Sequence, residues 1–95
     1  MSIENIVAII VAQPDHAAAV AQALEEAVHA VRKESGCEQY DLHRDRVNPN
    51  RFIMIERWRD EEAVRAHGTG EALRKLGAAL GSRATLDVIR LDAVV

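Results

Sequence analysis

The sequence has very few cysteine and aromatic residues. Among 95 residues there is one cysteine, one tryptophan, one tyrosine and one phenylalanine. The single Cys37 excludes an intramolecular disulfide and any zinc site built from several thiolates. The histidines are scattered and show no metal-ligand spacing; they are His16, His29, His43 and His67. We therefore expect neither a disulfide framework nor a bound metal.

Long apolar runs and an excess of positive charge are also missing. No apolar stretch approaches the roughly 20 residues of a membrane-spanning helix, and the N-terminus lacks the basic segment of a secretory signal. The formal net charge is −3, whereas nucleic-acid-binding domains are usually basic. These observations predict a protein with no membrane or nucleic-acid partner, located in the cytoplasm, where a lone thiol stays reduced.

The apolar residues that are present are mainly aliphatic. They make up 48% of the chain while aromatics make up 3%, so we expect a core of Ala, Val, Leu and Ile. A chain of this length is a single domain, residues 1–95, and buries only roughly 60 to 65% of its unfolded surface. A partner surface would therefore add to its stability.

The first third of the chain predicts a strand followed by a helix. Residues 3–12 form an apolar, β-branched run of the length typical of a strand buried on both faces. From residue 16 to 34, apolar residues recur at spacings of three and four, which predicts a helix with one buried side. Asp15 is the expected N-cap, and Gly36 suits the left-handed position after the helix.

The middle of the chain, residues 36–60, contains all three aromatic residues and predicts a β-hairpin. A turn cluster at residues 47–50 is flanked by alternating apolar and polar residues. With a four-residue loop, Leu42 lies opposite Ile55, and the side chains of Phe52, Met54, Glu56 and Trp58 share a face with His43. A shift of one residue instead places Tyr40 beside Glu56 and Leu42 beside Met54. Both registers fit the pattern.

The last third predicts a broken helix and a final strand. Asp60 is the expected N-cap of a short helix that ends near Gly68, and Thr69 is expected to cap a second piece that runs to about Leu80. Residues 85–95 form the last strand.

The resulting order is strand, helix, strand, strand, helix, strand. This βαββαβ order predicts an α+β, ferredoxin-like fold, in which both helices cover one face of a four-stranded antiparallel sheet. Ile53 and Ile55 alternate with Phe52 and Met54, so the other face of the sheet is apolar as well. We expect a second copy of the chain to cover that face in a two-fold homodimer.

The hairpin also carries a family resemblance. The motifs are G-C-x-x-Y-x-L-x-R-D at residues 36–45, N-P-N-R-F at 48–52, I-E-R-W-x-D at 55–60 and A-x-x-x-H at 63–67. Together they resemble the antibiotic biosynthesis monooxygenase domain, a family that includes quinol monooxygenases, an isomerase of a phosphorylated sugar and distant haem-degrading proteins. The resemblance implies a dimeric α+β barrel. One scaffold hosts several chemistries, so these motifs predict the fold better than the substrate.

The candidate catalytic residues are His67 and Glu56. A partly buried histidine near a carboxylate can transfer protons at neutral pH, although a lone histidine on the inner side of a helix is more often a packing residue. For Trp58, the resemblance implies a place beside the substrate cavity, while a core anchor is the ordinary role of a single tryptophan. The other candidate substrate-binding residues are Phe52, Met54, Tyr40, His43, Arg74 and Arg83.

No glycine-rich dinucleotide loop, phosphate-binding loop or metal cluster occurs in the sequence. The resemblance therefore implies cofactor-independent oxygenation, in which a deprotonated quinol or polyketide-type aromatic reacts directly with dioxygen. One alternative is an isomerase of a small phosphorylated hydroxyketone, with Arg74 or Arg83 on the phosphate. Another is a non-catalytic dimer that binds a small quinone-like ligand.

Overall fold

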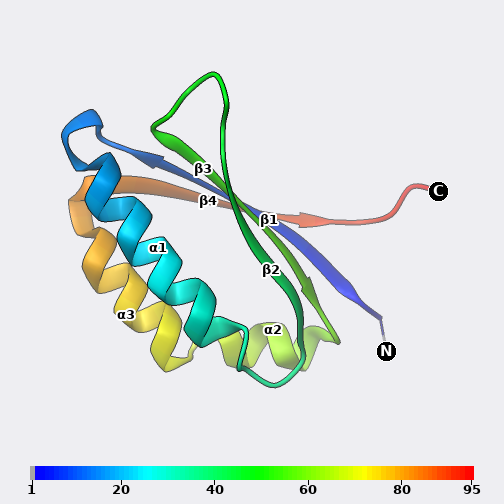
Figure 1. The fold of residues 1–95 in the computed structure, drawn as a ribbon. Coiled ribbons are helices and arrows are strands. Elements are labelled where there is room, and N and C mark those ends of the chain that lie inside the picture. Colours follow the sequence, from blue (N-terminus) through cyan, green and yellow to red (C-terminus); the bar gives the residue numbers. More distant parts are fainter. Residues whose placement is uncertain (1) are drawn as a thin grey trace.

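A computed structural model describes residues 2–95. The elements are β1 (Glu4–Ala12), a 3₁₀ turn (Pro14–His16), α1 (Ala17–Val31), β2 (Cys37–Arg44), β3 (Arg51–Trp58), α2 (Glu61–Gly68), α3 (Glu71–Leu80), a second 3₁₀ turn (Gly81–Arg83) and β4 (Ala84–Leu91). The strands form one antiparallel sheet in the order β2-β3-β1-β4, and the helices all lie on one side of it (Figure 1). This confirms the predicted α+β, ferredoxin-like βαββαβ fold.

The core lies between the helices and the face of the sheet that they cover, called here the inner face. Alternate residues of β1 are buried there, and Ile10 is almost completely enclosed. Leu24 and Val31 of α1 pack against this face with no exposed surface. Phe52 and Trp58 of β3 are the largest side chains in the core, so the few aromatics add bulk to a mainly aliphatic interior.

The opposite face of the sheet, called here the outer face, has no cover in the single chain. Val7, Ile9 and Val11 of β1 point to it and are half-buried, so the second face of β1 is less enclosed than the sequence predicts. Ile55 and Ile89 are 37% and 40% exposed on the same face. The outer face is therefore an apolar surface across the centre of the sheet.

The hairpin adopts the second of the two predicted registers. Tyr40 pairs with Glu56 and Leu42 with Met54, so the four-residue loop is wrong. The cause is Asp45, whose backbone N–H donates to the Arg51 carbonyl at 2.9 Å and whose carboxylate accepts from the Val47 N–H at 2.8 Å. These bonds extend the ladder by one pair and leave a five-residue loop.

The helix ends follow local hydrogen bonding. The Asp60 carboxylate accepts from the Ala63 N–H at 2.9 Å, which confirms the predicted N-cap of α2. Asp15 is not a cap, because the chain first makes a 3₁₀ turn and no side chain caps α1. Thr69 is not a cap either, because its hydroxyl donates to carbonyls at the end of α2 and Gly70 precedes α3.

Gly36 has a left-handed backbone with φ 82°, as predicted. A Cβ at this position would lie 2.5 Å from the Cβ of Ala63, so only glycine allows the start of β2 to approach α2 this closely. The two elements that carry Tyr40 and His67 are thereby held together.

We predict that Asp60→Ala lowers the free energy of unfolding by about 0.5 to 2 kcal/mol, because the Ala63 N–H loses its acceptor. Urea denaturation measures this change. Asp15→Ala is the matched control and is expected to change stability by less than about 0.5 kcal/mol. Equal losses in the two variants would contradict the assignment of Asp60 as the cap.

Candidate active site

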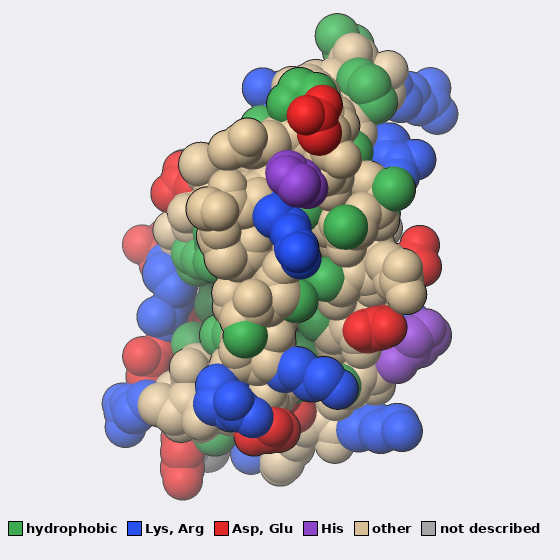
Figure 2. All heavy atoms as spheres, turned by 90° about the vertical axis from the view of Figure 1, so that its left-hand side faces the viewer, with side chains coloured by type: hydrophobic (Ala, Val, Ile, Leu, Met, Phe, Trp, Pro, Cys, Tyr) green, Lys and Arg blue, Asp and Glu red, His purple; other side chains and the backbone are tan. Residues whose placement is uncertain are grey.

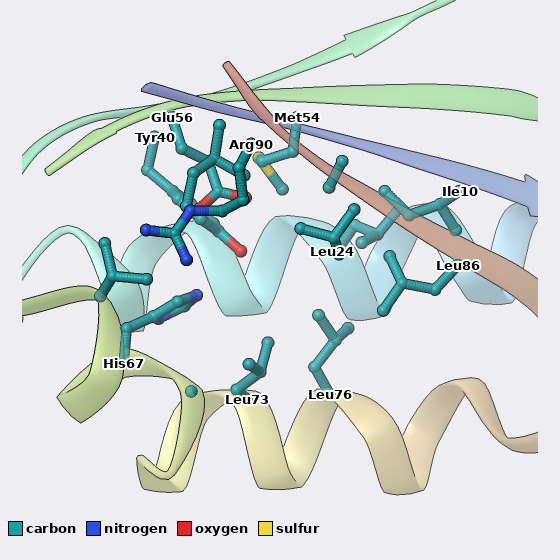
Figure 3. Close-up of a pocket in the computed structure, with 15 residues that line it drawn as sticks. Ile10, Leu24, Tyr40, Met54, Glu56, His67, Leu73, Leu76, Leu86 and Arg90 are labelled. Atoms are coloured by element: carbon teal, nitrogen blue, oxygen red, sulfur yellow. The ribbon is translucent and has the colours of Figure 1, made fainter. Parts of the chain in front are cut away.

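A cavity of about 200 Å³ lies between the inner face of the sheet and helices α2 and α3 (Figure 3). Its walls are mostly aliphatic, including Ile10 of β1 and Leu73 and Leu76 of α3. The volume is below the roughly 300 to 1,000 Å³ of typical ligand pockets, which favours a small ligand. The polar groups that line it are Tyr40, Glu56, His67 and Arg90.

The cavity opens beside β4, the edge strand. Leu86 and Val88 face the same side of the sheet as their partners Ile10 and Ala8, yet they are 52% and 53% exposed. The partners are buried, so the helices cover β1 and leave the inner face of β4 open. The cavity is therefore open to solvent along this edge.

His67 contacts one carboxylate and two aromatic rings of the site. It lies in the last turn of α2, is buried, and its Nδ1 is 2.9 Å from Oε1 of Glu34. The centre of its ring is 4.5 Å from that of Trp58 and 5.6 Å from that of Tyr40. These contacts fix the orientation of the imidazole, and the carboxylate beside it belongs to Glu34 at the end of α1.

Glu56 is buried on β3 and accepts a hydrogen bond from Trp58 Nε1 at 3.0 Å. Burial raises the pKa of Glu56, while the Trp58 bond and the nearby His67 act in the opposite direction. Burial also raises the pKa of Tyr40, helped by the charges of Glu56 and Glu34, so its phenol stays protonated and can donate. The cavity therefore holds a proton donor and a carboxyl group that exchanges its proton closer to neutral pH than an exposed one.

The structure brings together five of the nine predicted site residues. Tyr40, Met54, Glu56 and His67 line the cavity. Trp58 contacts Tyr40, Glu56 and His67 from behind the wall. Trp58 itself has no exposed surface.

The other four predicted residues lie away from the cavity. Phe52 is buried in the core, and Cζ of the Arg44 guanidinium lies 5.2 Å from the centre of its ring. His43 points to the outer face because of the register found for β2. Arg74 is exposed and paired with Glu71 on α3. Arg83 is exposed and donates to the Ala79 carbonyl at 3.0 Å. We correct the prediction that these four line the pocket.

Arg90 and Glu34 were not predicted. Arg90 reaches from β4 toward the side of the cavity that carries Tyr40 and Glu56 (Figure 3), and its guanidinium pairs with Glu4 at 2.8 Å and with Glu61. The alternation of side chains along β4 could have predicted Arg90, because Leu86, Val88 and Arg90 share one face of the strand. No sequence pattern indicates Glu34, which meets His67 across 33 residues.

Charges on the surface are mixed. Among the described residues on the side drawn in Figure 2, acidic and basic side chains are interspersed. In residues 2–95, no three His, Cys, Asp or Glu side chains gather to hold a metal ion. None of the helices in this range has the length and hydropathy needed to span a membrane.

Comparison with known proteins identifies the family. Residues 5–79 match the model of the antibiotic biosynthesis monooxygenase family. The chain belongs to this family. Membership supports a monooxygenase-like function in general terms and leaves the substrate open.

Solved structures agree with this family and its fold. A protein of known crystal structure from Pseudomonas aeruginosa shares 32% sequence identity with this chain. The two structures superpose with a TM-score of 0.92 over 100% of this chain and 97% of that one. A structure described as an antibiotic biosynthesis monooxygenase is 28% identical with a TM-score of 0.90, covering 97% and 99%. YcnE of Bacillus subtilis is 44% identical over 36 residues, a match that spans 38% of either protein.

The pKa shift of Glu56 predicts a pH-dependent stability. A raised pKa means that the folded protein keeps this proton where the unfolded chain has released it, so stability falls as the pH rises through that interval. Glu56→Gln keeps an acceptor for Trp58 and removes the titration. Relative to wild type, we expect its free energy of unfolding in urea to increase between about pH 4 and pH 7.

Glu25→Gln, an exposed change on α1, is the control and is expected to follow wild type across this range. If the difference in free energy of unfolding between Glu56→Gln and wild type is the same at both ends of this pH range, the raised pKa of Glu56 is contradicted.

Proposed function

We propose that this protein is a homodimeric, cofactor-independent monooxygenase that oxidises a small quinol or polyketide-type aromatic in the cavity. The observation that carries the proposal is a buried imidazole, fixed by a carboxylate and two aromatic rings, at the wall of an apolar cavity. Apolar walls bind an aromatic ring and exclude water, and the imidazole accepts the proton of its hydroxyl group.

The chemistry needs little beyond this proton transfer. One oxygen atom of O₂ is inserted into a ring C–H bond of the quinol. Oxidation of the quinol to the quinone level supplies the two electrons and two protons that reduce the other oxygen atom to water, so the product is a hydroxyquinone. Removal of the hydroxyl proton by His67 raises the electron density of the ring and starts its reaction with O₂. Burial holds the Tyr40 phenol protonated, so it would donate a hydrogen bond to an oxygen atom that gains charge.

The isomerase alternative has less support. A phosphorylated substrate needs cations in the cavity, and neither Arg74 nor Arg83 lines it. Arg90 does line it but is already paired with Glu4 and Glu61. The mainly aliphatic walls favour an apolar ligand.

The outer face supports the homodimer. It presents Val7, Ile9 and Val11 from β1 beside Ile55 and Ile89, an apolar surface that one chain leaves open to water. A two-fold axis that lies parallel to the sheet, between two copies placed face to face, would bury the same residues on both copies at once. A second copy over this face therefore removes the exposed apolar surface with no additional partner.

We predict that the protein consumes oxygen with a reduced naphthoquinone and that His67→Ala lowers kcat by about 100- to 10,000-fold, because the general base is lost. An oxygen electrode measures the rate. His43→Ala is the matched control: it removes a histidine on the outer face and is expected to retain activity within about twofold, provided that it remains dimeric. Equal rates for wild type and His67→Ala would remove His67 from the mechanism.

Ligand binding without oxygen consumption by wild type would instead identify a non-catalytic binding dimer, and the proposed oxidation would be wrong.

The homodimer is tested by sedimentation. We expect wild type to sediment as a dimer and Ile55→Glu to raise the dissociation constant at least about tenfold, because it buries a charge at the interface. Val47→Glu adds the same charge at the exposed hairpin tip and is expected to leave the dimer intact. A wild-type protein that sediments as a monomer at micromolar concentration would contradict the proposal.

A further inference from the structure

His67 separates two hollows of the molecule. One is the cavity; the other is an open cleft on the helix side, formed where the end of α1 meets α2 and α3 and called here the outer cleft. His67 lines both, whereas Glu34 lines only the outer cleft and Glu56 only the cavity. The two carboxyl groups therefore approach the imidazole from different sides.

The contact with Glu34 determines where the imidazole carries its proton. An ionised carboxylate only accepts hydrogen bonds, so the nitrogen that faces it at 2.9 Å must be the donor. That nitrogen is Nδ1. In the neutral ring, Nε2 is then left with its lone pair.

Nε2 is open to a hollow rather than enclosed by protein. Within residues 2–95 it has no hydrogen-bond partner, and this part of the chain contains no side-chain nitrogen or oxygen atom that is both fully buried and unpartnered. The ring extends from α2 toward the cavity in Figure 3, and Trp58 and Tyr40 hold it on its sides. The free lone pair is thus directed to the place where a substrate hydroxyl would lie.

The other polar groups near His67 are less well placed to accept a proton from a substrate hydroxyl or to orient the imidazole. Glu56 already accepts from Trp58, and Tyr40 is held protonated by burial. Arg90 faces the cavity with its guanidinium paired. On the other side, Lys33, Glu71 and Lys75 line the outer cleft without a hydrogen bond to His67. Among the described residues, Glu34 is the only charged residue with a hydrogen bond to the imidazole.

We propose that Glu34 is a positioning residue: it holds His67 in the Nδ1–H tautomer, so that Nε2 is the base that faces the cavity. Its catalytic consequence rests on the proposed function. When Nε2 takes the proton from a substrate hydroxyl, the ring becomes an imidazolium that keeps its Nδ1 proton. The Glu34 carboxylate stabilises that positive charge until the proton is passed on to a reduced oxygen atom.

The tautomer is measured by long-range ¹H–¹⁵N correlation NMR of the imidazole at a pH of about 8, above the ordinary titration range of histidine. We expect the Nδ1–H form in wild type and in Glu34→Gln, whose amide oxygen still accepts. In Glu34→Ala we expect the Nε2–H form, which free imidazole side chains favour. Glu71→Gln, which removes a charge from the same outer cleft, is the matched control and is expected to match wild type.

Kinetics separate positioning from substrate binding. We expect Glu34→Ala to lower kcat by about 10- to 100-fold with KM changed less than about twofold, and Glu34→Gln to lie between it and wild type. An Nε2–H tautomer in wild type, or Glu34→Ala with the tautomer and kcat of wild type, would overturn the proposal. Wild type could oxidise no quinol while the tautomer still differs between wild type and Glu34→Ala. In that case the proposed oxidation fails, and the role of Glu34 in orienting His67 stands.

Discussion

The pairing of Tyr40 with Glu56 determines which side chains of β2 and β3 face the helices. Side chains alternate between the two faces of a strand, so a change of one residue in this pairing moves the whole of β2 relative to β3. The observed register places Tyr40 and Glu56 together on the inner face. Asp41 and His43, which alternate with Tyr40 along β2, point to the outer face. The cavity and the apolar outer face therefore lie on opposite sides of the sheet.

Hydrogen bonds stabilise the two ionisable side chains of the inner cluster, Glu56 and His67. A buried carboxyl group without a hydrogen bond would be costly, but Glu56 accepts from Trp58. The imidazole of His67 is paired with Glu34 at the edge of the core, where part of the carboxylate remains in contact with water. The contacts that make these groups tolerable also give them defined orientations, which is what proton transfer to a small bound ligand requires.

The sequence predicted the elements and the fold but only part of the site. The apolar periodicities, together with Gly36 and Asp60, were sufficient to place the helices and strands in a ferredoxin-like order. The register was open because loops of four and five residues fit the same turn cluster, and only the Asp45 hydrogen bonds distinguish them. Glu34 could not be found, because its contact with His67 depends on how α1 ends relative to α2, which no local pattern encodes.

In the proposed reaction, the apolar cavity binds an aromatic hydroxyl group against Nε2 of His67. The most direct measurement is a crystal structure of the protein with a quinol analogue that cannot be oxidised. We expect the ring of the analogue to lie between the inner face of the sheet and α3, with one hydroxyl oxygen within hydrogen-bonding distance of Nε2. An analogue bound in the outer cleft, or with its oxygen atoms turned away from His67, would contradict it.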